Sequence, residues 1–157
     1  EFAACADTVM VTLSKGLGCP VGSMLAASGE VIARARIIRR RLGGAMRQAG
    51  IIAAAGLHAL DHHRERLQED HQRARMLARL AAHVPHIRVL EPETNIVMFD
   101  VLHPQLTAAD VVEGLGDRGV LLVPFTERRV RAVTHLDVDD DDVRLAASAM
   151  AEFFAHA

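Results

Sequence analysis

An apolar run that ends in a glycine-rich turn is the feature that most constrains how this chain folds. Residues 8–13 are Thr-Val-Met-Val-Thr-Leu, a segment rich in β-branched side chains, and they predict a buried strand. Three glycines and one proline follow within residues 16–22, and they stop any regular element there. Lys15 stands between the two segments, so we expect it at the end of the strand.

The position of Lys15 allows two interpretations. An amine that has lost part of its hydration is available in the neutral, nucleophilic form, which suits Schiff-base chemistry with the carbonyl of an aldehyde cofactor. The glycines would let the backbone approach a flat ligand closely. The alternative is a solvated lysine with no chemical role, which is the usual state of a lysine that follows a strand.

The remainder of the chain predicts alternating helices and short strands. The helix expected at residues 30–42 should end at Gly43 and Gly44, and the helix expected at residues 64–83 should end at Pro85. The helix expected at residues 107–118 should be capped by Thr107 and end at Gly119. The expected strands after the first are residues 23–27, 87–90, 95–101, 120–123 and 130–134, and the expected helices are residues 30–42, 45–63, 64–83, 107–118 and 140–155.

The second expected helix bears on domain organisation. Residues 45–63 are small and apolar around nearly the whole helix, which predicts a buried helix at a domain or subunit interface. We expect a boundary between residues 61 and 70. The part that follows should be a compact α+β layer with strands of mixed direction.

Composition argues against several classes of partner. The net charge is −2, and no Trp or Tyr accompanies the five arginines of residues 34–41, which disfavours nucleic acid. Cys5 and Cys19 lack both CxxC spacing and the dense pattern of a secreted disulfide scaffold, which favours a cytoplasmic protein. No apolar run approaches the roughly 20 residues that span a bilayer, so we expect no membrane segment.

Three other clusters have structural interpretations that outweigh the chemical ones. His58 and His62 have a spacing that can chelate a metal, but no third ligand is indicated, and histidines near a helix C-terminus favour its dipole. The aspartates of residues 137–141 lack the glycine and closing glutamate of a calcium loop and should instead supply charge at the start of the last helix. We therefore expect no metal. Ser14 and Lys15 do not suit a serine–lysine dyad, because adjacent strand residues point to opposite faces.

Two arginines occupy positions in which each could bind an anionic group. Arg131 is flanked by apolar residues in the expected strand 130–134, and an arginine in such a place usually has a carboxylate partner. Any nearby Asp or Glu could be that partner. Arg47 follows the break at residues 43–44, so its guanidinium could project from the first turn of the next helix toward an anion.

Three segments resemble motifs of the pyridoxal-phosphate-dependent threonine aldolases, in the beta-eliminating lyase/threonine aldolase family. Residues 14–23 (Ser-Lys-Gly-Leu-Gly-Cys-Pro-Val-Gly-Ser) resemble the family's cofactor-lysine motif, and residues 43–50 (Gly-Gly-Ala-Met-Arg-Gln-Ala-Gly) resemble its next signature. Residues 131–138 (Arg-Ala-Val-Thr-His-Leu-Asp-Val) are similar to its C-terminal motif. The resemblance covers essentially the whole chain but only the second half of a family subunit, so we expect the C-terminal portion of a longer enzyme.

The resemblance implies an α/β fold: the C-terminal part of a fold-type-I, PLP-dependent transferase-like subunit of the aspartate-aminotransferase class. Residues 1–63 would be the end of the large PLP-binding domain, with the end of its sheet, the cofactor lysine and an interdomain helix. Residues 64–157 would be the small C-terminal α+β domain. The family also implies a homo-oligomer, a dimer of dimers, with sites built between subunits.

Four residues would have defined roles in such an enzyme. Lys15 would be the catalytic residue and would hold pyridoxal 5′-phosphate (PLP) as a Schiff base. Arg47 would lie near the cofactor phosphate, as would Arg40, which stands where the family often has a lysine. Arg131 would bind the α-carboxylate of the amino acid substrate.

The reaction that the resemblance implies is retro-aldol cleavage of L-threonine and similar β-hydroxy amino acids to glycine and an aldehyde. The groups that stack on the cofactor ring, face its pyridine nitrogen and form the phosphate loop would belong to the other half, so this chain alone should be inactive. Another fold-type-I lyase that performs β-elimination is one alternative. A non-catalytic fragment or assembly module is the other.

Overall fold

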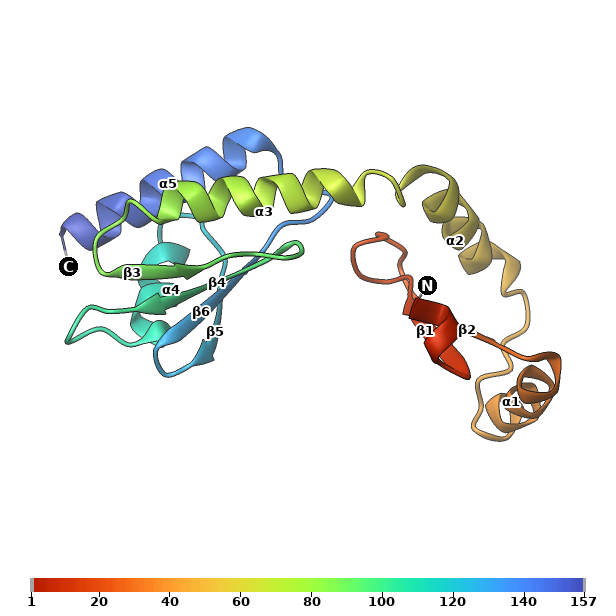
Figure 1. Ribbon diagram of the computed structural model, residues 1–157. Coiled ribbons are helices and arrows are strands. Elements are labelled where there is room, and N and C mark those ends of the chain that lie inside the picture. The colour runs from red at the N-terminus through yellow and green to blue at the C-terminus, as the bar shows by residue number, and fades with distance from the viewer. Residues whose placement is uncertain (1, 157) are drawn as a thin grey trace. The chain divides into compact units, whose positions relative to one another are not determined.

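The computed structural model describes residues 2–156. The chain divides into two compact units, Glu1–Arg66 and Leu67–Ala157 (Figure 1). Among the described residues, no helix is both long enough and apolar enough to cross a membrane.

The first unit begins with a short 3₁₀ helix, η1 (Phe2–Cys5), and an antiparallel hairpin of β1 (Thr8–Thr12) and β2 (Ser23–Ala27). Both strands lie where the sequence predicts them. The prediction that the first strand is buried is wrong, because the side chains of β1 are exposed or half-buried. The physical reason is that β1 pairs with β2 alone, and a two-stranded ribbon cannot bury its own faces.

Helix α1 (Gly29–Arg41) is defined by caps at both ends. Ser28 is the N-cap, and its hydroxyl accepts a hydrogen bond from a backbone N–H of the first turn. At the other end Gly43 adopts φ +79°, and Gly44 donates its N–H to the carbonyl of Arg39 at 2.8 Å, which completes a Schellman cap. A Cβ on Gly44 would lie 2.8 Å from Cγ of Arg39, so this approach requires glycine. The predicted helix end is confirmed.

Helix α2 (Gly50–His62) starts five residues later than the sequence predicts. An irregular turn precedes it, in which Gln48 has a φ of 53° that an α-helix cannot include. Within this chain most of α2 is exposed, and its predicted burial at a domain or subunit interface stays a prediction. Gly56 and Ala59 are the buried residues of α2, whereas Ile51 is 81% exposed.

The second unit combines a four-stranded sheet with three helices. Its elements are α3 (Leu67–Ala81), β3 (Ile87–Leu90), β4 (Ile96–Val101), α4 (Ala108–Gly116), β5 (Val123–Thr126), β6 (Arg129–Val133) and α5 (Asp140–Ala155). The strand order is β3-β4-β6-β5, and each neighbouring pair is antiparallel. The predicted α+β layer with strands of mixed direction is confirmed, because neighbouring strands alternate in direction. β6 inserts between β4 and β5, which run parallel to each other.

The ends of α4 explain one further difference. Thr107 caps it in a reciprocal capping box with Asp110, as the sequence predicts for the N-cap. At its C-terminus Gly119 has φ +79°, and Val120 donates its N–H to the carbonyl of Leu115 at 3.0 Å. The strand expected from residue 120 begins only at Val123, because Val120 belongs to this cap.

The helices of the second unit contribute to one core on one face of the sheet, where α3 and α5 lie side by side (Figure 1). The buried strand side chains that enter this core are Ile87, Val97, Phe99, Val101, Val130 and Ala132. The alternating side chains point to the opposite face, which we call the open face. It consists of Arg88, Leu90, Ile96, Met98, Asp100, Val123, Arg129, Arg131 and Val133.

Candidate active site

Lys15 lies in a closed loop of residues 13–22, here called the lysine loop, which joins β1 to β2. At its base the N–H of Leu13 donates to the carbonyl of Gly22 at 3.0 Å. Within it the carbonyl of Lys15 accepts a hydrogen bond from Gly18 at 2.8 Å, and Gly18 has φ +70°. Lys15 therefore sits three residues beyond the last residue of β1, in a turn that glycine makes possible.

One side of the lysine loop is anchored to α2. Leu13, Leu17 and Cys19 are buried, with 8%, 8% and 6% of their surface exposed. A Cβ on Gly56 would lie 3.3 Å from Cδ1 of Leu13, so the missing side chain at position 56 admits the leucine. The Cys19 thiol donates to the carbonyl of Ala55 at 3.5 Å. Packing thus fixes the loop from one side.

His63 adds a hydrogen bond between the lysine loop and the end of α2. Its Nδ1 lies 2.8 Å from the carbonyl oxygen of Leu17, and since a carbonyl only accepts, Nδ1 donates. Sequence analysis missed this role, because the two residues are 46 apart and only the folded loop brings them together. The rings of His58 and His62 lie 4.4 Å apart. No group of three or more His, Cys, Asp or Glu residues within positions 2–156 is placed to hold a metal ion.

Lys15, Arg40 and Arg47 all have exposed side chains. Lys15 is the only lysine in the sequence. Arg40 lies in the last turn of α1. Arg47 lies in the turn before α2, so the prediction that it belongs to the first turn of that helix is wrong. No described hydrogen bond or ion pair joins any two of these three residues.

Arg131 lies on the open face of the second unit, in β6. Met98 of β4 and Val123 of β5 stand opposite it in the register. The side chain is half-buried, and its Nε is buried with no hydrogen-bond partner among the described residues. The intramolecular carboxylate that the sequence analysis allowed for is therefore not bonded to this Nε. A buried N–H without a partner costs free energy unless a ligand supplies an acceptor.

Two other arginines bind the carboxylate of Asp100, which is 7% exposed. Arg129 Nε lies 2.6 Å from Oδ1, and Arg88 Nη2 lies 2.7 Å from Oδ2. The hydrogen bond from Arg129, and after it that from Arg88, holds the pKa of Asp100 below its ordinary value of 3.8, although burial alone would raise it. The Asp100 carboxylate in turn raises the pKa of Arg129.

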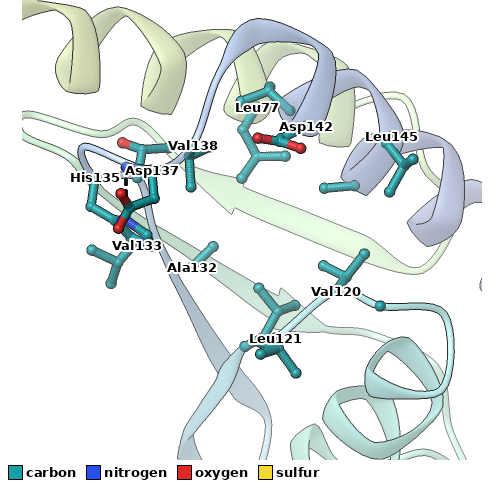
Figure 2. Close-up of a pocket in the computed structure, with 15 residues that line it drawn as sticks. Leu77, Val120, Leu121, Ala132, Val133, His135, Asp137, Val138, Asp142 and Leu145 are labelled. Atoms are coloured by element: carbon teal, nitrogen blue, oxygen red, sulfur yellow. Dashed lines mark hydrogen bonds and ion pairs between the residues drawn. The ribbon is translucent and has the colours of Figure 1, made fainter.

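A cavity of about 300 Å³ lies in the second unit, between the helices and the end of β6 (Figure 2). Its lining is mostly apolar, and Arg131 does not line it. Two of its polar side chains have structural partners: the hydroxyl of Thr134 donates to the carbonyl of Asp70 at 2.6 Å, and Asp142 completes the capping box of α5. None of Lys15, Arg40, Arg47 and Arg131 lines this cavity.

The fold is that of fold-type-I PLP-dependent enzymes. A crystal structure from Exiguobacterium sp. 255-15, assigned to the aromatic amino acid beta-eliminating lyases and threonine aldolases, matches with a TM-score of 0.75 and 21% identity, over 97% of this chain and 46% of that one. A C-DES mutant with glycine covalently linked to its PLP cofactor matches with a TM-score of 0.55 and 26% identity, over 66% of this chain and 28% of that one.

The sequence profile of the beta-eliminating lyases matches residues 1–103, and this chain belongs to that family. Low-specificity L-threonine aldolase 1 of Arabidopsis thaliana is 40% identical over 146 residues, which cover 91% of this chain and 41% of the relative. The chain thus spans less than half the length of the Arabidopsis relative it matches.

Proposed function

We propose that this chain supplies the cofactor lysine and the substrate-binding arginine of a PLP-dependent enzyme that cleaves L-threonine and similar β-hydroxy amino acids to glycine and an aldehyde. The observation on which the proposal rests is the buried Nε of Arg131, which lacks a partner in the described part of the chain. A planar guanidinium binds a carboxylate through two parallel hydrogen bonds, and an amino acid brings such a carboxylate. The 40% identity to a threonine aldolase supports this choice of substrate.

Lys15 is the residue that we assign to the cofactor. Its exposed side chain stands on a loop whose other side is anchored, so the amine is accessible while its base is fixed. A neutral Nζ is the nucleophile that an aldehyde requires, and no other lysine is present in the chain. Bound PLP supplies an electron sink for the pair released when the bond between Cα and Cβ breaks. Before that bond breaks, the amino group of the substrate would have to displace Nζ, and Arg131 would hold the substrate carboxylate.

Arg40 and Arg47 are assigned to the cofactor phosphate. Both are exposed and have no described ion pair, which leaves their guanidinium groups available to an anion. An arginine at position 40, where the family often has a lysine, keeps the charge and adds a planar pair of donors.

The chain would act as part of a longer subunit. Residues 1–63 would complete the large PLP-binding domain, and residues 64–157 would be the small domain that presents Arg131. We expect a homo-oligomer, a dimer of dimers, in the cytoplasm. This chain incubated alone with PLP and threonine should form no glycine at an enzyme-like rate, and such a rate would contradict this part of the proposal.

The direct test is the substitution Arg131→Met in the full-length protein that contains this chain. Loss of the guanidinium group should raise KM for threonine at least about tenfold, since a hydrogen bond to a charged group contributes about 1.5–3 kcal/mol. Arg144→Met is the matched control, because Arg144 lies on α5 and pairs with Asp141 at 2.8 Å. An unchanged KM in Arg131→Met would overturn the assignment.

The name of the matching family favours one alternative, a lyase that performs β-elimination. Product analysis separates the two reactions. Threonine should yield glycine and acetaldehyde, whereas loss of the β-substituent from tryptophan or cysteine, without glycine from threonine, would support the alternative.

A further inference from the structure

The open face holds one carboxylate close to Arg131. Asp100 is the only acidic residue in β3, β4, β5 and β6. In the register Asp100 stands opposite Arg129, while Arg131 stands opposite Met98, two positions along β4. Asp100 and Arg131 are therefore diagonal neighbours across two strands, at a typical separation of about 7–8 Å that a long side chain can span.

Asp100 nevertheless does not serve Arg131, because other donors occupy both of its oxygens. Among residues 2–156, the donor to Oδ1 is Arg129 Nε, at 2.6 Å. Oδ2 accepts from Arg88 Nη2 at 2.7 Å and Nε at 3.2 Å, and from Arg129 Nη2 at 3.2 Å. Arg131 lies two residues further along the same face of β6, and its Nε has no partner in the part of the chain that the structure describes.

We infer that Arg129 keeps Arg131 available to the substrate carboxylate by occupying Oδ1 of Asp100. Arg129 is thus a positioning residue for substrate binding, and this inference rests on the proposed function of Arg131. Without Arg129, Oδ1 would be an unsatisfied carboxylate oxygen on the same face as the Nε of Arg131, which has no partner among the described residues. An intramolecular partner has a high effective concentration, so Asp100 would then compete with the amino acid for Arg131.

The two arginines on Asp100 are not equivalent, and this supplies a matched control. Both hydrogen bonds from Arg88 go to Oδ2, so removing Arg88 leaves Oδ1 covered. Removing Arg129 uncovers Oδ1. Both substitutions delete one positive charge beside the same carboxylate, and only one of them should affect Arg131.

The experiment measures glycine binding by equilibrium dialysis in the full-length, PLP-loaded protein. Arg129→Met should weaken the Kd for glycine about tenfold, as expected when one charged hydrogen-bond partner is diverted. Arg88→Met should leave it within about twofold, a change below the size of one such bond. Adding Asp100→Asn to Arg129→Met should restore the Kd, because the competing charge is gone. A crystal structure of cofactor-free Arg129→Met should show Arg131 bonded to Asp100.

Each outcome distinguishes this inference from the proposed function. The inference is wrong, and the role of Arg131 stands, if Arg131→Met abolishes glycine binding while Arg129→Met leaves glycine binding unchanged. The same conclusion follows if adding Asp100→Asn to Arg129→Met fails to restore glycine binding. If Arg131→Met itself leaves binding intact, the proposed function of Arg131 is wrong and the inference falls with it. If Arg129→Met does not fold, Asp100→Asn alone decides: binding should be equal or tighter, and a loss would overturn the inference.

Discussion

Two glycines of the same helix, Gly114 and Gly116 of α4, differ in what surrounds them. A Cβ on Gly114 would overlap the ring of Phe153 on α5, whereas a Cβ on Gly116 would meet nothing within 4 Å. The ring also packs under the guanidinium of Arg118, whose carbon lies 5.4 Å from the ring centroid. Single positions in this core are therefore constrained by contact rather than by backbone conformation.

Gly114→Ala should destabilise the second unit by about 1–3 kcal/mol, the usual range for overpacking a core. Gly116→Ala should be neutral or slightly stabilising, because alanine favours a helix and finds open space there. Urea unfolding followed by circular dichroism measures both. Equal stabilities of the two variants would show that the ring of Phe153 moves aside without cost.

Residue-level predictions from the sequence succeed where the information is local. The strand around Arg131 could be predicted from its apolar flanks, but the link between Asp100 and Arg129 could not. These two residues are 29 apart, and the pairing depends on which strand neighbours which and in what register. The roles of Lys15, Arg40, Arg47 and Arg131 stay predictions that the experiments above decide.

At the scale of elements, the lysine loop depends on α2 for its position. The Nδ1 of His63 and the buried thiol of Cys19 are the polar contacts of that anchor. Because Cys19 is only 6% exposed, its rate of reaction with a thiol reagent reports how often the loop opens.

His63→Ala should therefore speed labelling of Cys19 about fivefold, the effect of losing roughly 1 kcal/mol of hydrogen bonding. His63→Asn is the matched control, since its amide nitrogen replaces Nδ1 at the same distance along the side chain, and it should stay close to the wild-type rate. The assay uses a Cys5→Ser background, so that the exposed thiol does not contribute. Equal rates in the alanine and wild-type proteins would contradict the anchoring role.

The N-terminus of α5 makes stability depend on pH. Asp139 accepts hydrogen bonds from the backbone N–H groups of Asp141 and Asp142, at 2.8 and 2.9 Å. The bonds with Asp142, and then with Asp141, hold the pKa of Asp139 below its ordinary value of 3.8. The carboxylate stabilises the fold above that value, and this contribution is lost as the pH falls through the lower, folded-state pKa.

Asp139→Ala should lower the midpoint of thermal unfolding at neutral pH, as the loss of a helix N-cap does. Asp139→Asn should keep most of the cap but flatten the fall in stability below pH 3.8. Asp137→Ala is the control, because that exposed side chain makes no capping bond. Thermal unfolding across the acidic range tests this, and an unchanged acid slope in Asp139→Asn would contradict it.

The ends of helices and strands could be predicted from the sequence where they depend on a few adjacent residues, and not where they depend on distant ones. Caps at Thr107, Gly43 and Gly119 could be predicted, since capping depends on a few adjacent residues. The late start of α2 could not, because its apolar composition favours helix while the backbone at Gln48 interrupts it. The insertion of β6 between β4 and β5 is a property of the whole sheet.

At the scale of the whole molecule, the two units differ in how much apolar surface they bury. The second unit encloses a core of its own. The first exposes large apolar side chains on its strands and helices alike, among them Met10 (63%), Met24 (55%), Ile37 (55%), Ile51 (81%) and Leu57 (65%). Such a surface is typical of an interface with further protein, as the end of a larger domain would require.

The central claim is that Lys15 carries the cofactor, and one measurement tests it most directly. The full-length protein that contains this chain is incubated with PLP, reduced with borohydride, digested and mapped by mass spectrometry. Because Lys15 is the only lysine in these 157 residues, the position of the label is unambiguous within them. The account predicts a phosphopyridoxyl group on Lys15, absent from Lys15→Ala. A label fixed on a lysine outside this chain, with Lys15 unmodified, would contradict it.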